Sequence, residues 1–187
     1  MESFQKSLNK QRLQTKDIVI TGMFTAVICV MSQISIPIQP IPFTLALFAI
    51  FLTGALLEPR YAFFSVLCYL LLGAFGLPVF AGFKGGLQNL VGMTGGYLAA
   101  YPIMALVTSL LYSRAKKYKT ISLVIGMLIS LVICYGIGTI WFSYISGTGF
   151  YKSLTLCVFP FIPFDLVKIA LATSVGSVIR KTIINQI

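Results

Sequence analysis

Long apolar runs with almost no charge dominate this sequence, and they restrict what it can fold into. Of its 187 residues, 58% are hydrophobic and 10% are charged, whereas soluble domains carry about 25% charged residues. The runs approach the ~20 residues that an α-helix needs to cross the hydrocarbon core of a bilayer. The sequence therefore predicts an all-α integral membrane protein.

Six runs are candidates for membrane-spanning helices and indicate a six-helix bundle. They cover residues 18–36, 43–57, 61–77, 95–112, 121–145 and 154–179. The second run is short, because Glu58, Pro59 and Arg60 stop it abruptly. We divide the chain into a basic cytoplasmic N-terminal segment, residues 1–17, and a six-helix membrane domain, residues 18–187.

The lysines and arginines predict the orientation of these runs. When the six runs are threaded in alternating directions, 11 of the 14 cationic residues fall on one side, and only Lys84 and Lys152 fall on the other. The positive-inside rule then places both termini in the cytoplasm. This clustering in short connections also argues against a nucleic-acid partner, despite the net charge of +10. The N-terminal segment is either a surface helix with Phe4 and Leu8 facing lipid or a frayed tail.

The sequence offers no pattern typical of an enzyme or a metal site. It has no histidine, and its four cysteines lie within apolar runs without a C-x-x-C pair, so we expect no zinc site and no His-based triad. The segment "GFKGG" lacks the G-x-x-x-x-G-K-[ST] spacing of a phosphate loop. We therefore expect no ATP site in this chain, no catalysis by it and no cofactor.

Two outward connections differ from ordinary loops. "IPIQPIPF", residues 36–43, contains three prolines that favour an extended polyproline-like path, suited either to a lid or to a plain connector. Residues 76–98 contain seven glycines and several apolar side chains. Irregular backbone at membrane depth is tolerated only where protein or a cavity covers it, so we expect this segment to fold back into the mouth of the bundle. Gln88 and Asn89 would then face inward.

Asp165 and Lys168 lie in one of the most apolar stretches of the chain, "FPFIPFDLVKIA". Three residues apart on a helix, they face the same way, and the small residues Ala172 and Gly176 on that face are expected to leave room beside them. A charge within a span costs about 2.5–3.5 kcal/mol, and such residues usually mark substrate or ion paths. A ligand site is one interpretation, and an ion pair that only fixes helix packing is the other.

Four segments together resemble the BioY family, the biotin-binding S components of energy-coupling factor (ECF) transporters. They are "GLPVFAG" (76–82), "GG" (85–86), "TGGYL" (94–98) and "PFDLVK" (163–168), and the resemblance spans residues 15–180. It implies a bundle of six helices in the cell membrane that binds one biotin near its outer side. It also implies a transmembrane T component and two ABC-type ATPases as partners, which supply ATP hydrolysis for uptake.

The resemblance also implies which residues act. The family docks on its T component through A-x-x-x-A on the first helix, which appears here in relaxed form as Gly22 and Ala26. The family's T-x-Q reads Thr44-Leu45-Ala46, and its proline before "TGGY" is Met93. The candidate biotin-binding residues are Asp165, Lys168, Asn89, Tyr97, Gly96, Gln88, Phe43 and Thr44.

The donors and acceptors of these side chains suit biotin, which has two N–H donors and a carbonyl in its ureido ring and a carboxylate at the end of its chain. An ionised Asp165 accepts hydrogen bonds, Lys168 donates them and Asn89 does both. Which of them meets the ureido ring and which the carboxylate stays open. A stand-alone carrier for a small carboxylate vitamin, with Asp165 as its proton site, is the alternative function.

Overall fold

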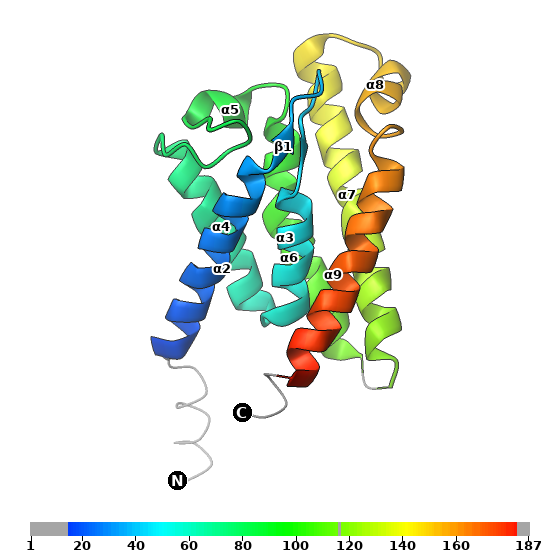
Figure 1. The fold of residues 1–187 in the computed structure, drawn as a ribbon. Helices are drawn as coiled ribbons and strands as arrows, with labels where there is room; N and C mark the ends of the chain where they lie inside the picture. Colours follow the sequence, from blue (N-terminus) through cyan, green and yellow to red (C-terminus); the bar gives the residue numbers. More distant parts are fainter. Residues whose placement is uncertain (1–14, 116, 183–187) are drawn as a thin grey trace, which may run out of the picture.

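The computed structural model describes residues 15–115 and 117–182, and in it long helices run antiparallel to one another (Figure 1). The predicted surface helix with Phe4 and Leu8 lies outside these residues. The elements, in chain order, are α2 (Thr15–Gln33), β1 (Ser35–Ile36), β2 (Phe43–Thr44), α3 (Ala46–Leu56), α4 (Pro59–Ala74), α5 (Leu87–Val91), α6 (Gly95–Arg114), α7 (Lys119–Ser146), α8 (Phe150–Cys157) and α9 (Ile162–Thr182).

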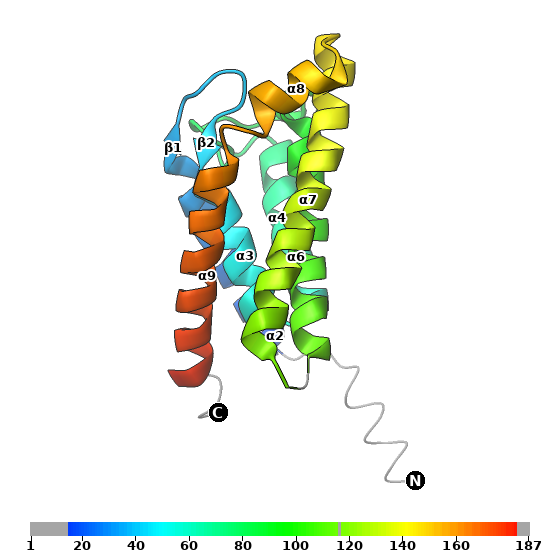
Figure 2. The same cartoon turned by 90° about the vertical axis from the view of Figure 1, so that its right-hand side faces the viewer.

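Four helices of the described chain, α2, α6, α7 and α9, are long and apolar enough to cross a bilayer. Helices α2, α6 and α7 confirm the first, fourth and fifth predicted spans, and α9 covers only the later part of the sixth. Helices α3 and α4 are apolar but shorter. The start of α2 and the end of α9 lie at one end of the bundle (Figure 1). The β1–β2 hairpin, α5 and α8 gather at the opposite end, which we call the hairpin end (Figures 1 and 2).

Helix α3 forms the centre of the bundle. Nine of its 11 residues are buried, which is typical of a helix that is apolar on every side. With a rise of 1.5 Å per residue, α3 is only about 16 Å long, so its free backbone groups end inside the protein. The Leu57 carbonyl accepts a hydrogen bond from Ser109 at 2.6 Å. Arg180 of α9 donates to the carbonyls of Ala55 at 2.6 Å and Leu56 at 3.2 Å.

The predicted sixth span, residues 154–179, is wrong as a single helix. A turn at residues 158–161 separates α8 from α9, and Pro160 lies within it. Proline has no N–H group and disfavours helical geometry in the residue before it. Asp165 consequently lies in the first turn of α9, where a helix N-terminus stabilises negative charge.

The proline-rich connection is part of a small hairpin rather than a wholly extended path. Ser35 pairs with Thr44, and Ile36 pairs with Phe43, in an antiparallel two-stranded sheet. This sheet adds a β element to a fold predicted to be all-α. It also ties residues 37–42 down at both ends over the mouth of the bundle (Figure 2).

The glycine-rich segment folds back onto the bundle, as predicted. Phe80 is only 3% exposed, and its ring meets that of Tyr69 edge-on at 5.5 Å. A Cβ atom at Gly73 would lie 2.1 Å from the Phe80 ring, so only glycine leaves space for this insertion. Gln33 accepts a hydrogen bond from the Phe83 N–H at 3.0 Å, and Trp141 donates to the Gly92 carbonyl at 2.8 Å.

Candidate functional site

A cavity with two adjoining lobes lies at the hairpin end. The outer lobe has a volume of about 150 Å³ and the inner lobe about 50 Å³. The lobes adjoin, because the same five residues line both: Ile41, Pro42, Thr44, Tyr97 and Tyr101. The hairpin and α6 therefore contribute to both lobes.

The inner lobe contains the predicted charge pair. The Lys168 ammonium lies 2.8 Å from Asp165 Oδ1, and the two residues are 5% and 2% exposed. The ammonium also lies 4.0 Å from the centroid of the Phe43 ring, which is within the range of a cation–π interaction. The pair is thus compensated, as a buried charge must be, and both residues line the cavity.

Tyr135 of α7 completes this group and was not among the predicted site residues. Its hydroxyl donates to Asp165 Oδ2 at 2.6 Å, a length typical of a strong bond to a carboxylate. It lines the inner lobe beside the pair. The sequence shows only that Tyr135 is a tyrosine within a long apolar run. It does not show which helix its hydroxyl contacts.

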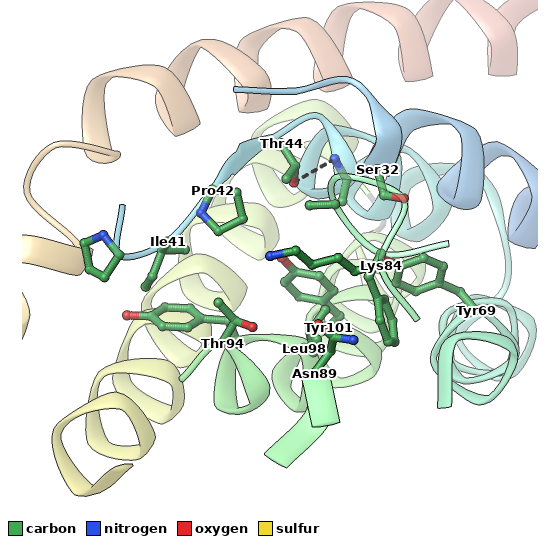
Figure 3. A pocket seen from close by; sticks show the side chains of 15 residues that line it. Ser32, Ile41, Pro42, Thr44, Tyr69, Lys84, Asn89, Thr94, Leu98 and Tyr101 are labelled. Atoms are coloured by element: carbon green, nitrogen blue, oxygen red, sulfur yellow. Dashed lines mark hydrogen bonds between the residues drawn. The ribbon is translucent and has the colours of Figure 1, made fainter. Parts of the chain in front are cut away.

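The outer lobe has a different set of polar groups. Ser32, Lys84, Asn89 and Thr94 line it, and none of the four lines the inner lobe (Figure 3). The Asn89 amide group donates to the Gly85 carbonyl at 2.8 Å, which fixes its orientation. The site therefore has an ion pair with a phenol at one pole and an amide, two hydroxyls and an ammonium at the other.

Three tyrosines form much of the apolar wall. Tyr69 lines the outer lobe, and Tyr97 and Tyr101 contribute to both lobes. The Tyr97 hydroxyl lies 3.3 Å from Thr139 Oγ1, and its ring packs on Gly138 of α7, where a Cβ atom would lie 2.2 Å from the ring. Contacts with α7 accordingly hold the Tyr97 ring in place between the two lobes.

The structure brings most of the predicted residues to the cavity. Asp165, Lys168, Asn89, Tyr97 and Thr44 line it, and Phe43 contacts the Lys168 ammonium without lining the cavity itself.

Three other placements differ from expectation. Gln88 is exposed and donates to the Gly85 carbonyl at 3.2 Å, so it does not face inward with Asn89. Gly96 faces α7, where a Cβ atom would lie 2.3 Å from Trp141 Cβ, so its role is close helix packing. Gly176 packs against Ala55 of α3, and Ala172 is fully buried, so these small residues do not leave room beside the pair.

The predicted docking residues lie elsewhere, on the outside of the bundle. Gly22 and Ala26 are exposed and line an open apolar groove of about 890 Å³ between α2 and α4. A Cβ atom at Gly22 would meet nothing within 4 Å, so no part of the described chain fills this surface.

Comparison with known proteins shows what this architecture is similar to. A sequence model of the BioY family matches residues 5–185. The probable biotin transporter BioY of Pyrococcus horikoshii is 40% identical over 165 residues, covering 88% of this chain and 96% of the relative. The biotin transporter BioY of Thermotoga maritima is 39% identical over 171 residues, covering 89% and 96%.

The fold has a solved counterpart. A crystal structure of the S-component for biotin from an ECF-type ABC transporter superposes with a TM-score of 0.85. It is 27% identical, and the match covers 91% of this chain and 96% of that one.

Proposed function

Because this chain belongs to the BioY family, we propose that it is the biotin-binding S component of an ECF-type importer. The observation that carries the proposal is the two-pole cavity at the hairpin end. Asp165 and Lys168 offer an acceptor and a donor at one pole, Asn89 offers both at the other, and Tyr97 lies between them. This spacing of polar groups in apolar walls suits a small ligand with a polar ring and a polar chain end.

We propose that the four long helices and the two shorter ones, α3 and α4, all lie within the membrane as a six-helix bundle, with both termini in the cytoplasm. The cationic residues at the starts of α2 and α4, at the end of α9 and around the α6–α7 connection support this orientation, because these segments share one end of the bundle (Figure 1). A cysteine introduced by Lys84→Cys should react with an impermeant thiol reagent added outside cells. If this cysteine reacts only in inverted vesicles, the orientation is the opposite of the one proposed.

We propose that a T component and two ABC-type ATPases are partners in uptake, since this chain lacks a phosphate-loop pattern. The purified chain should bind about one biotin on its own, because the cavity groups come from this single chain. ATP-dependent uptake should appear only when the chain is expressed with the partners. If calorimetry detects no heat when biotin is added to a folded sample, biotin is not the substrate. If this chain alone takes up biotin and a protonophore abolishes that uptake, the result supports a proton-coupled carrier.

The groove of Gly22 and Ala26 is the proposed surface for the T component. Small residues let helices approach closely, and this surface is open. In the same uptake experiment, Gly22→Leu and Ala26→Leu should abolish assembly and uptake while biotin binding persists, because the cavity lies at the hairpin end. Normal assembly of both variants would place docking on another surface.

A further inference from the structure

The cavity carries an unbalanced positive charge. Lys168 and Asp165 line the inner lobe, and Lys84 lines the outer lobe, so the lining of the two lobes holds two ammonium groups and one carboxylate. A cleft lined by an excess of one sign of charge concentrates ligands of the opposite sign. The cavity therefore favours an anion, and the question is which ammonium group receives it.

Lys168 is not suited to be that group. Its ammonium is bonded to Asp165 at 2.8 Å and lies over the Phe43 ring, so its charge is already balanced. An anionic group placed beside Lys168 would also meet the Asp165 carboxylate, and like charges at short range disfavour ionisation of both. A neutral urea fits this pole better, because its N–H groups can donate to Asp165 and its carbonyl can accept from Lys168.

Lys84 has the opposite properties. Its backbone N–H donates to the Phe80 carbonyl at 3.2 Å, and its carbonyl accepts from the Phe80 N–H at 2.9 Å, which fixes the residue at the rim of the outer lobe. Its side chain extends across the cavity between Pro42 and Tyr101 (Figure 3). The Lys168–Asp165 pair is the only salt bridge in residues 15–115 and 117–182, so no described carboxylate neutralises Lys84. Lys84 is exposed, so water solvates its charge when the cavity is empty.

We infer that Lys84 recognises the carboxylate of the ligand, and that it thereby sets the direction in which the ligand lies. This inference rests on the proposed function. The ureido ring of biotin then occupies the inner lobe at Asp165 and Lys168, the bicyclic body lies along Tyr97, and the carboxylate reaches Lys84 beside Asn89. Lys84 is a specificity-determining residue that distinguishes the free acid from neutral derivatives.

The test compares biotin with biotinamide, in which a neutral amide replaces the carboxylate, by calorimetry on the purified full-length chain. The Lys84→Met variant should bind biotin about five- to tenfold more weakly than the parent, because it loses a charged hydrogen bond at a partly exposed site. The affinity of this variant for biotinamide should fall by less than about twofold, because a neutral amide gains little from an ammonium group in a site that water reaches. Lys84→Arg should restore biotin binding, since it retains the charge.

Lys152→Met is the matched control, because Lys152 is an exposed cation of α8 that does not line the cavity. It should leave both affinities unchanged. Equal loss of biotin and biotinamide in Lys84→Met, or no loss of either, overturns the assignment of Lys84 while the proposed function stands. A parent chain that binds neither compound overturns the proposed function and the inference with it.

Discussion

Asp165→Asn and Lys168→Met are each expected to weaken biotin binding at least tenfold while the protein still inserts and folds. Each change leaves the opposite charge unpaired in an apolar pocket and removes a ligand group. A buried unsatisfied group costs about 1–3 kcal/mol, more if it is charged, and about 1.4 kcal/mol corresponds to tenfold in affinity. Tyr135→Phe should cost less, about three- to tenfold, because it removes one hydrogen bond to Asp165 and no charge.

Calorimetry on purified protein measures this series, and Lys181→Met provides the control, since Lys181 is exposed near the opposite end of the same helix. The decisive variant is the double change Asp165→Asn with Lys168→Met. It removes the pair without leaving a lone charge, so it separates ligand contacts from electrostatic strain. Binding by the double variant as tight as the parent would mean that the pair only fixes helix packing.

Gly138→Ala is expected to reduce both stability and biotin affinity, although it adds only a methyl group. The new Cβ would lie 2.2–2.5 Å from three atoms of the Tyr97 ring, so the ring must move toward the cavity. Overpacking of this kind costs about 1–3 kcal/mol. Because Tyr97 lines both lobes, we expect about a tenfold loss of affinity together with a lower melting temperature in detergent.

Gly136→Ala is the matched control, two residues earlier on α7. A Cβ atom there would meet nothing within 4 Å, so the variant should keep its affinity and gain up to about 1 kcal/mol from helix propensity. Combining Gly138→Ala with Tyr97→Ala removes the clash and should recover part of the melting temperature without recovering affinity. Unchanged affinity in Gly138→Ala alone would show that the position of the Tyr97 ring does not govern binding.

Hydropathy and charge predicted the features of this fold that depend on composition. The membrane class and the four long helices follow from apolar length, and the positions of Asp165 and Lys168 are conspicuous because charges are rare in such segments. The glycines of residues 76–98 correctly indicated a segment that folds back, because buried irregular backbone needs close approach and unusual turns.

The features that sequence reasoning missed depend on contacts between distant segments. Hydropathy does not reveal the helix break at Pro160, because its neighbours Phe159 and Phe161 keep the hydropathy high through the turn. Helix α5 has only five residues, too few for periodicity to show that Asn89 faces the cavity and Gln88 does not. The hydroxyl of Tyr135 meets Asp165 across 30 residues, a pairing that no local pattern encodes.

The short helix α3 has a consequence for the order in which the chain can be completed during synthesis. With 11 residues, it lacks the length that lets an apolar segment settle stably across a bilayer by itself. Its last carbonyls accept hydrogen bonds from Arg180, which lies 125 residues after Ala55 and therefore leaves the ribosome long after α3 does. Until α9 is made, those carbonyls lack the donor that Arg180 provides, so the centre of the bundle acquires these hydrogen bonds only when α9 packs against it. Truncation within α9 therefore exposes the innermost helix rather than a peripheral one.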